Sequence, residues 1–316
     1  MQPPTSAVHG GPYDLDALFL AVGQFAVQGA PMEAPTEREV PTTPAELIDV
    51  VAAPIHCGAL EVAGFVDGIQ NGLIITWRER RPVYLMYYAA GAIASVVTGD
   101  GNPIDLMERL TIVCAEEDRE WAESLGTNIP IEVLEPVTPP ELSGQAVKFL
   151  RNQRDDLERQ LIERLGRVVE HPLVVDGHLV SRPADNEIIG QRGLVGVVKT
   201  QRTRYLADES ILWNLPAGWR SPRFKLPAGT GGPSQERYSC YLRLHDSAHQ
   251  PWDFGLIRVE AYVPELLDEL CARCLAERQG PGGDRRWATH IRSVRGVEEF
   301  LRSRRPVVFG LSQDRS

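Results

Sequence analysis

The sequence predicts an α/β protein in which helices flank a sheet. Two observations support this class: a series of short, alternating apolar runs bounded by polar turns, and one long helical pattern over residues 142–170. Over 316 residues, a hydrophobic content of 43% and a charged content of 24% are ordinary for a globular domain with a sizeable core. The expected strands are residues 62–67, 72–77, 83–88, 110–115, a run ending at Asp176, 193–198, and a hairpin of 237–244 and 254–262.

The order of these elements suggests an N-terminal arm and one larger domain. Residues 1–60 read as a helical segment interrupted by prolines, so we expect an arm over 1–60 and one larger domain over 61–316. The first three strands form a meander, the fourth is followed by a short helix, and the Pro-rich residues 130–140 read as a connector.

Cysteine content and hydropathy bear on the compartment. Five cysteines, an odd number, favour a reducing compartment, so we expect a cytoplasmic protein. The apolar run Val83–Thr98 is too short for a confident membrane span, and no membrane partner is expected. Cys271 and Cys274 form a CxxC inside a helical pattern, which favours two buried thiols over zinc or redox chemistry.

Two similar peptides carry the first functional signal. Phe65-Val66-Asp67-Gly68 and Val174-Val175-Asp176-Gly177 each lead an apolar run into an Asp-Gly step. An ionised aspartate is rarely buried unless it is paired or binds a metal, and the following glycine permits a sharp turn or a close approach. The alternative for each copy is a strand followed by an ordinary Asp-Gly turn.

The long helix supplies a third carboxylate. Glu158 falls within the apolar stripe that includes Leu150, Leu161 and Leu165, and Arg154 precedes it by one turn on the same face. Glu158 is therefore either a metal ligand or a glutamate neutralised by arginine. Three carboxylates suit Mg²⁺ or Mn²⁺, and two such ions about 4 Å apart can hydrolyse a phosphodiester.

Charge is unevenly distributed along the chain. Residues 1–150 carry 7 Lys and Arg against 21 Asp and Glu, whereas residues 151–316 carry 26 against 22. The second half could therefore contact phosphates, although a solvated surface is the alternative for each basic cluster. The candidate DNA-binding residues are Arg154, Arg202, Arg204, Arg285 and Arg286.

In their order, these motifs resemble the NurA nuclease family from about residue 60 to the end. Gly196-Val197-Val198-Lys199 stands where the family has a strand ending in Lys, and Arg258-Val259-Glu260 follows the aromatic and basic strand Tyr241-Leu242-Arg243-Leu244. Trp287-Ala288-Thr289-His290 looks like the family's His ahead of the last helix. The chain departs from the pattern at Ile69 and His178, where family members commonly have Ser.

The resemblance implies an RNase H-like mixed sheet, with C-terminal hairpin and helix additions, and a metal-dependent DNA nuclease. In that reading Asp67, Glu158 and Asp176 hold Mn²⁺ or Mg²⁺, His290 acts on the attacking water or the phosphate, and Lys199 neutralises charge. His178 and Glu260 are possible additions, and an ion pair across the sheet is the alternative for Lys199 and Glu260.

The resemblance also implies partners: DNA, a second copy of the chain, and a hexameric HerA-type ATPase, in DNA repair or phage defence. The sequence contains no GxxxxGK[ST] phosphate loop, so any ATP-driven movement needs such a partner. Two other hypotheses remain: a non-catalytic DNA-binding or scaffold subunit with a nuclease-like fold, and a nuclease that cuts RNA or RNA–DNA hybrids.

Overall fold

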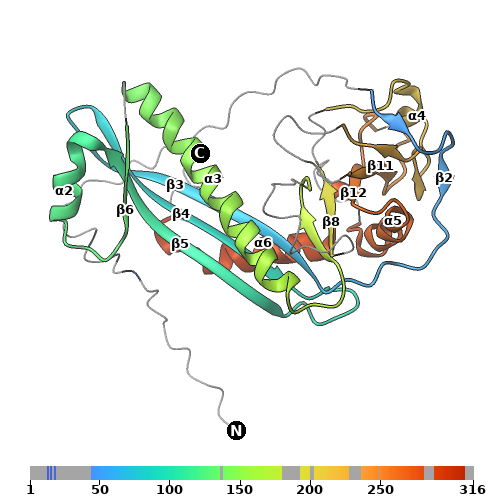
Figure 1. The fold of residues 1–316 in the computed structure, drawn as a ribbon, viewed down its shortest axis with the longest axis horizontal. Helices are drawn as coiled ribbons and strands as arrows, with labels where there is room; N and C mark the ends of the chain where they lie inside the picture. The colour runs from blue at the N-terminus through green and yellow to red at the C-terminus, as the bar shows by residue number, and fades with distance from the viewer. Residues whose placement is uncertain are drawn as a thin grey trace, which may run out of the picture.

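A mixed sheet of 12 strands, flanked by helices, forms the protein (Figure 1). The computed structural model describes residues 13, 15, 18, 44–135, 138–179, 193–199, 203–227, 236–248, 250–280 and 288–309. Its strands are β1 Glu46–Leu47, β2 Ala53–Pro54, β3 Gly64–Arg78, β4 Arg81–Ile93, β5 Pro103–Ala115, β6 Ile131–Leu134, β7 Leu173–Asp176, β8 Leu194–Val198, β9 Trp219–Arg220, β10 Phe224–Lys225, β11 Tyr238–Arg243 and β12 Leu256–Ala261. Its helices are α2 Arg119–Ser124, α3 Pro139–Gly166, α4 Ser210–Trp213, α5 Leu266–Glu277 and α6 Arg292–Arg304. The predicted α/β class is confirmed.

The sheet combines an antiparallel meander with a parallel centre. Its main strand order is β1-β10-β11-β12-β8-β7-β3-β4-β5-β6, with β2 and β9 attached beside β11. Strands β3, β4 and β5 are antiparallel neighbours, whereas β7 runs parallel to both β3 and β8. The hairpin of β11 and β12 then continues the sheet from β8.

The predicted meander differs from the structure in one respect that matters for the site. The separate strands expected over 62–67 and 72–77 form the single strand β3, so Asp67-Gly68 lies within a strand and is not a turn. Pairing with β4 from Phe65 onward overrides the local turn signal of the Gly-containing stretch 68–72. The actual turn is at Glu79 and Arg80, which both have positive φ.

The strands predicted over 83–88 and 110–115 are present but longer, as β4 and β5, and the expected helical character of the first 60 residues is wrong for 44–60, where β1 and β2 form by pairing with β10 and β9. The other predicted elements are present. The long helix covers Pro139–Gly166, and the strand ending at Asp176, the strand over 193–198 and the C-terminal hairpin are all present. The predicted connector over 130–140 instead contains β6, which pairs in parallel with β5.

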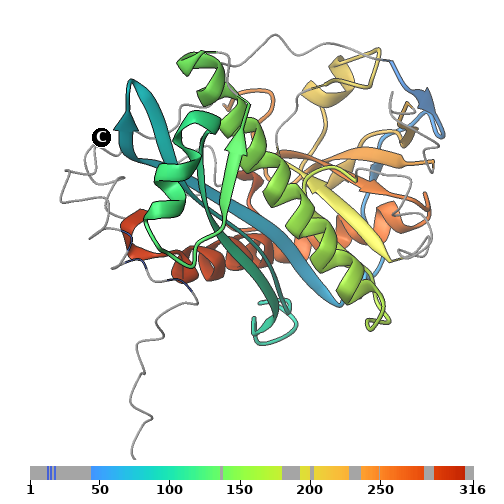
Figure 2. The ribbon, with the colours of Figure 1, turned by 60° about the vertical axis from the view of Figure 1, so that its left-hand side comes forward.

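Helices cover both faces of the long strands. Helix α3 packs on one face through buried leucines, including Leu150, Leu157 and Leu161, and α6 packs on the other through Val297 and Leu301. Figure 2 shows α3 and α6 on opposite sides of β3, β4 and β5. Each strand residue therefore faces either α3 or α6, which fixes the direction of every polar side chain near the sheet centre.

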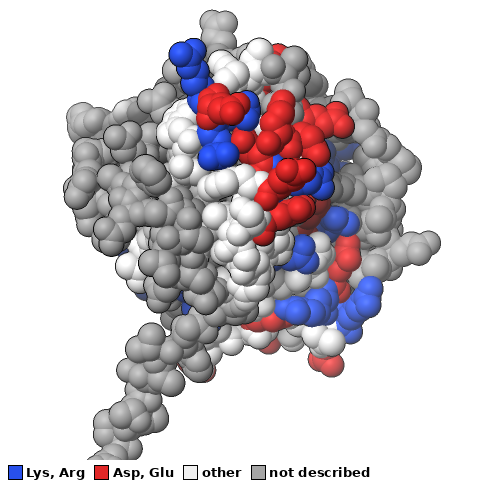
Figure 3. Space-filling view, turned by 90° about the vertical axis from the view of Figure 1, so that its left-hand side faces the viewer, with Lys and Arg blue, Asp and Glu red and all other residues white. Residues whose placement is uncertain are grey.

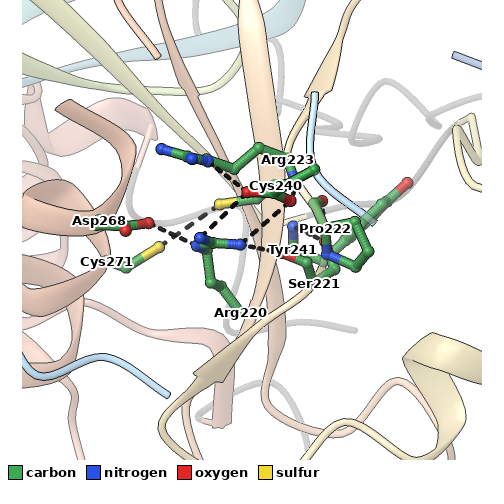
Figure 4. Close-up of polar contacts among 9 residues, drawn as sticks. Arg220, Ser221, Pro222, Arg223, Cys240, Tyr241, Asp268 and Cys271 are labelled. Carbon is green, nitrogen blue, oxygen red and sulfur yellow. Dashed lines mark hydrogen bonds and ion pairs between the residues drawn. The ribbon is translucent and has the colours of Figure 1, made fainter. Parts of the chain in front are cut away.

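Residues 44–60 pair with the C-terminal part of the sheet. β1 pairs with β10 and β2 pairs with β9. Asp49 accepts hydrogen bonds from the backbone N–H and Nε of Arg223 at 2.6 and 2.7 Å, and Arg220 binds both Asp49 and Asp268 of α5 (Figure 4). The domain division at residue 60 stays a prediction.

Acidic side chains gather at the end of the molecule that contains α2. Figure 3 views this end, and the exposed glutamates of α2 and the preceding turn are Glu116, Glu117, Glu120 and Glu123. This distribution agrees with the acidic first half of the sequence. Within the described part of the chain, no helix combines the length and apolar character needed to cross a membrane.

Candidate functional site

Two aspartates occupy corresponding positions on the adjacent parallel strands β3 and β7. The last paired residues are Val66 and Val175, and Asp67 and Asp176 are the next residues on each strand. Asp67 also lies opposite Gly91 of β4, where a Cβ atom would meet Leu301 of α6 at 2.8 Å. Because facing residues of paired strands share a face, both carboxylates lie on the α6 side of the sheet.

Asp67 is in an unfavourable place for a negative charge. Burial raises the pKa of Asp67 well above its usual range, the charges of Asp176 and Glu158 raise it further, and Lys199 opposes them. Its Oδ1 accepts a hydrogen bond from the N–H of Gly68 at 2.7 Å. Among the described residues, no Lys or Arg lies within ion-pair distance of this carboxylate, so it lacks a direct counter-charge.

Lys199 pairs with the second aspartate. It follows the last residue of β8, and its Nζ lies 2.8 Å from Oδ2 of Asp176, with both side chains about one-fifth exposed. His290, which precedes α6, lies within electrostatic reach of this pair. Burial lowers the pKa of His290, and the charge of Lys199 lowers it further while that of Asp176 opposes the change. Asp67, Asp176, Lys199 and His290 thus lie near one another, and their roles stay predictions.

Glu158 approaches from the other face of the sheet. It projects from α3 over Gly68, and a Cβ atom at Gly68 would overlap its carboxylate. Arg154 lies one turn earlier with its Nε 3.2 Å from Oε1 of Glu158. Burial raises the pKa of Glu158 to about 7; the charge of Arg154 opposes this shift, whereas Asp155 and Asp176 add to it.

The arrangement bears directly on metal binding. No three His, Cys, Asp or Glu side chains converge at metal-binding distance within the ranges described, because Glu158 and the two aspartates approach the end of β7 from opposite faces. The donors themselves are all carboxylate oxygens, which hard divalent cations prefer, and a cation would relieve the repulsion that raises the pKa of Asp67. The chemistry of the donor set therefore fits Mg²⁺ or Mn²⁺, with Asp67 and Asp176 as the shared pair.

His178 belongs to a separate polar cluster. Gly177 has φ +120°, so the chain turns after Asp176 and the imidazole does not follow the direction of that side chain. His178 Nδ1 lies 2.8 Å from Nη2 of Arg258 and 3.1 Å from Oε1 of Glu260. The two possible additional site residues therefore contact each other: His178 lies in the turn after β7, and Glu260 lies on β12.

Glu260 in this cluster is completely buried yet ionised. Burial acts to raise the pKa of Glu260, but the hydrogen bond with His178 and the charges of Arg258 and Arg237 hold it below its usual value. Its Oε2 also accepts the N–H of Leu179 at 2.9 Å. Arg237, the first residue of the predicted hairpin strand, also belongs to this cluster, although the sequence did not single it out. The alternation of Arg258 and Glu260 on one strand was the sequence feature that indicated a buried charge cluster.

Of the remaining predicted DNA-binding residues, the structure describes Arg204. Arg204 pairs with Glu209 at 2.7 Å, and its guanidinium lies over the ring of Trp252. Arg202, Arg285 and Arg286 lie outside the described residues. The predicted DNA contacts of these arginines stay predictions.

The CxxC cysteines are structural thiols, as predicted. Cys271 and Cys274 are buried on α5, and the Sγ of Cys271 lies 3.7 Å from that of Cys240 (Figure 4). Burial raises the pKa of both helix thiols, which keeps them protonated.

Comparison with solved structures finds similarity to structures of NurA. The NurA nuclease from Sulfolobus solfataricus aligns with a TM-score of 0.45 and 9% sequence identity over 80% of this chain and 81% of that chain. A second NurA structure aligns with a TM-score of 0.38 and 7% identity over 82% of this chain and 92% of that chain. No protein-family model matches the chain, and no curated protein matches its sequence.

Proposed function

We propose that this protein is a divalent-metal-dependent nuclease that hydrolyses phosphodiester bonds in DNA. The observation that carries the proposal is the placement of Asp67 and Asp176 side by side on parallel strands, next to Lys199 and His290. Two adjacent carboxylates, of which Asp67 has a raised pKa, together with a cation and a neutral imidazole, are the groups that phosphodiester hydrolysis uses.

Each side chain has a role that follows from its surroundings. Asp67 and Asp176 would hold Mg²⁺ or Mn²⁺, and Glu158 would contribute from the α3 face through bound water. A divalent ion there supplies a more acidic bound water and stabilises negative charge on the phosphate, and a second ion would extend this to the leaving oxygen. The lowered pKa of His290 keeps its imidazole neutral near pH 7, so it can accept the proton of the attacking water. The ammonium of Lys199 can pair with a phosphate oxygen.

The surroundings of the site limit how DNA approaches. The acidic end around α2 repels a phosphate backbone, so DNA would reach the site from the half of the chain that carries most of the basic residues. Arg154, which borders Glu158, and Arg204 are described candidates for phosphate contacts there. Arg202, Arg285 and Arg286 complete the proposed set.

We further propose the biological setting that the motif order suggests. The protein would act in the cytoplasm as a homodimer with a hexameric HerA-type ATPase, in DNA repair or phage defence. Free cysteines, four of them buried, support a reducing compartment. The absence of a GxxxxGK[ST] motif supports a separate ATPase as the source of movement.

Cleavage of end-labelled single- and double-stranded DNA tests this function. Purified protein is incubated with Mn²⁺, Mg²⁺ or EDTA beside Asp67→Ala and Asp176→Ala, with the HerA-type ATPase and ATP in parallel reactions. We expect metal-dependent cleavage that both substitutions abolish. Labelled RNA and RNA–DNA hybrid in the same assay test the alternative substrates, and cleavage confined to them would contradict the DNA assignment.

A non-catalytic DNA-binding or scaffold subunit is the second candidate. It is favoured by the internal cations that already contact Asp176 and Glu158, since paired carboxylates need no metal. Thermal unfolding separates the two hypotheses, because a metal site that binds Mn²⁺ in the folded state raises the melting temperature as Mn²⁺ is added. DNA binding without cleavage, together with a melting temperature independent of Mn²⁺, would favour the scaffold.

A further inference from the structure

The Asp67–Asp176 pair contains an internal cation. We propose that Lys199 is the resident counter-cation of this pair, that its ammonium supplies the positive charge which a divalent ion supplies in the loaded site, and that metal binding displaces it. This inference rests on the proposed metal dependence, and it adds a competition between a side chain and the metal for the same carboxylates.

The two aspartates need a counter-charge because of their register. Asp67 and Asp176 follow the paired residues Val66 and Val175 on neighbouring strands, so their carboxylates are held on one face by the backbone. Like charges that the backbone holds together repel, and burial strengthens the repulsion by removing water. The backbone positions of the two aspartates cannot separate without breaking the strand pairing that places them.

Lys199 is the group that meets this need. Among the described residues, it is the only Lys or Arg within ion-pair distance of either aspartate, with its Nζ 2.8 Å from Oδ2 of Asp176. It lies two residues beyond Val197, the partner of Asp176 on β8, and therefore shares the face of the aspartate pair. The charge of Lys199 also lowers the pKa of Asp67, which the charge of Asp176 raises.

A similar pairing exists on the other face. Arg154 contacts Glu158 as Lys199 contacts Asp176, so Glu158 and Asp176 each have a cation partner without metal. The two pairs differ: Arg154 balances one carboxylate, Glu158 of the same helix, whereas the charge of Lys199 acts on two aspartates from two strands. The site is therefore most sensitive to the loss of Lys199.

The chemistry of lysine suits displacement. Its ammonium is a compact charge on a flexible stem of four carbons, so it can leave Asp176 without movement of the backbone. Once a divalent ion occupies the aspartate pair, the freed ammonium is repelled by that ion and is available to a phosphate oxygen. Lys199 would thus stabilise the metal-free site and contact substrate in the loaded one.

Isothermal titration of the full chain with Mn²⁺ tests the competition directly. We expect Lys199→Met to bind Mn²⁺ up to about fivefold more tightly than the wild type, the factor that corresponds to the loss of one partly exposed ion pair. Lys225→Met is the matched control, because it removes the same charge from an exposed ion pair with Glu236, and its affinity should equal that of the wild type.

Two further variants keep the test valid if Lys199→Met is unstable. Lys199→Gln keeps a hydrogen-bond donor for Asp176 without the charge, and we expect it also to bind Mn²⁺ more tightly. Lys199→Arg keeps the charge and should retain roughly the wild-type affinity. In EDTA, Lys199→Met and Lys199→Gln should melt below the wild type, and Mn²⁺ should raise their melting temperatures by more than it raises that of the wild type.

Equal or weaker Mn²⁺ binding by both uncharged variants would overturn this inference. The cleavage assay of the wild type separates that result from failure of the nuclease proposal. Metal-dependent cleavage with unchanged Mn²⁺ affinity in the variants would leave the nuclease standing and remove the competition. An inactive wild type whose uncharged variants bind Mn²⁺ more tightly would confirm the competition and remove the nuclease. If neither the wild type nor the uncharged variants bind Mn²⁺, the proposed competition is wrong. Cleavage that persists in EDTA would then indicate a metal-independent nuclease.

Discussion

Asp67 and Asp176 occupy matching positions on two adjacent parallel strands, one residue beyond the paired Val66 and Val175. The backbone therefore holds two carboxylates on the same face of the sheet, where burial and mutual repulsion raise the pKa of Asp67. Such an arrangement opposes folding unless a cation compensates it, and this cost is the basis of the first prediction below.

Removal of the charge at Asp67 should stabilise the metal-free protein. We expect Asp67→Asn to raise the free energy of unfolding by about 1 kcal/mol in EDTA at pH 8, because asparagine can still accept the N–H of Gly68 without repelling Asp176. Urea denaturation measures the change. Asp208→Asn is the control, since hydrogen bonds with Ser210 lower the pKa of exposed Asp208 and its neutralisation should not stabilise. A destabilised Asp67→Asn protein would contradict the proposed repulsion.

Glu158 should make the metal-free protein less stable as pH rises. Its folded-state pKa is raised by burial to about 7 from an ordinary 4.5, so its contribution to stability is full below pH 4.5 and is lost as pH approaches and passes 7. The wild type should lose up to about 3 kcal/mol more between pH 5 and 8 than Glu158→Gln does. Urea unfolding across this range in EDTA gives the comparison. Glu141→Gln, in the exposed first turn of the same helix, should keep the wild-type slope, and parallel profiles for the wild type and Glu158→Gln would refute the assignment.

A side chain at Gly68 should displace the Glu158 side chain. A Cβ atom there would overlap the Glu158 carboxylate, which ends a flexible side chain, so we expect Gly68→Ala to lower the free energy of unfolding by about 1 kcal/mol. The double variant Gly68→Ala with Glu158→Ala should recover part of this loss. In contrast, Gly144→Ala adds a Cβ to exposed Gly144 of α3 with nothing within 4 Å, and it should stabilise by up to about 1 kcal/mol. Equal effects of the two glycine substitutions, measured by thermal or urea unfolding, would be inconsistent with the contact.

Thiol reactivity should distinguish one cysteine from the others. Cys57 is exposed, whereas Cys114, Cys240, Cys271 and Cys274 are buried. With an aromatic disulfide reagent under native conditions, we expect one of the five thiols to react quickly, and all five after unfolding. Rapid reaction of three or more in the folded protein would mean that the CxxC segment is not packed as observed.

The sequence singles out Asp67 and Asp176, which the structure places on adjacent strands, but it does not predict the extent of the strand that holds Asp67. Alternation and the Asp-Gly steps identified Asp67 and Asp176, but the glycines at 68 and 72 looked like a turn, although both lie inside β3. Pairing with β4 along the whole strand, a nonlocal effect, overrides that local signal. Likewise, β6 was hidden in a Pro-rich stretch because only its parallel pairing with β5 makes it a strand.

The direction of the third carboxylate also needed the structure. The apolar stripe of the helix correctly predicted that Glu158 faces the sheet. The sequence could not show which face of the sheet α3 covers. The structure places Glu158 over Gly68, opposite the face of the two aspartates. Similarly, the spacing of Asp176 and His178 suggested a shared direction, and the positive φ of Gly177 turns the imidazole toward Arg258 and Glu260 instead.

The most direct test of the metal site is anomalous diffraction from crystals soaked with Mn²⁺. We predict an anomalous peak within about 2.5 Å of a carboxylate oxygen of both Asp67 and Asp176, with Nζ of Lys199 moved away from its present 2.8 Å contact with Asp176. Crystals of Asp176→Asn should lack the peak. Wild-type crystals with no peak at the end of β7, or with Mn²⁺ bound only elsewhere, would contradict the assignment of this aspartate pair as a metal centre.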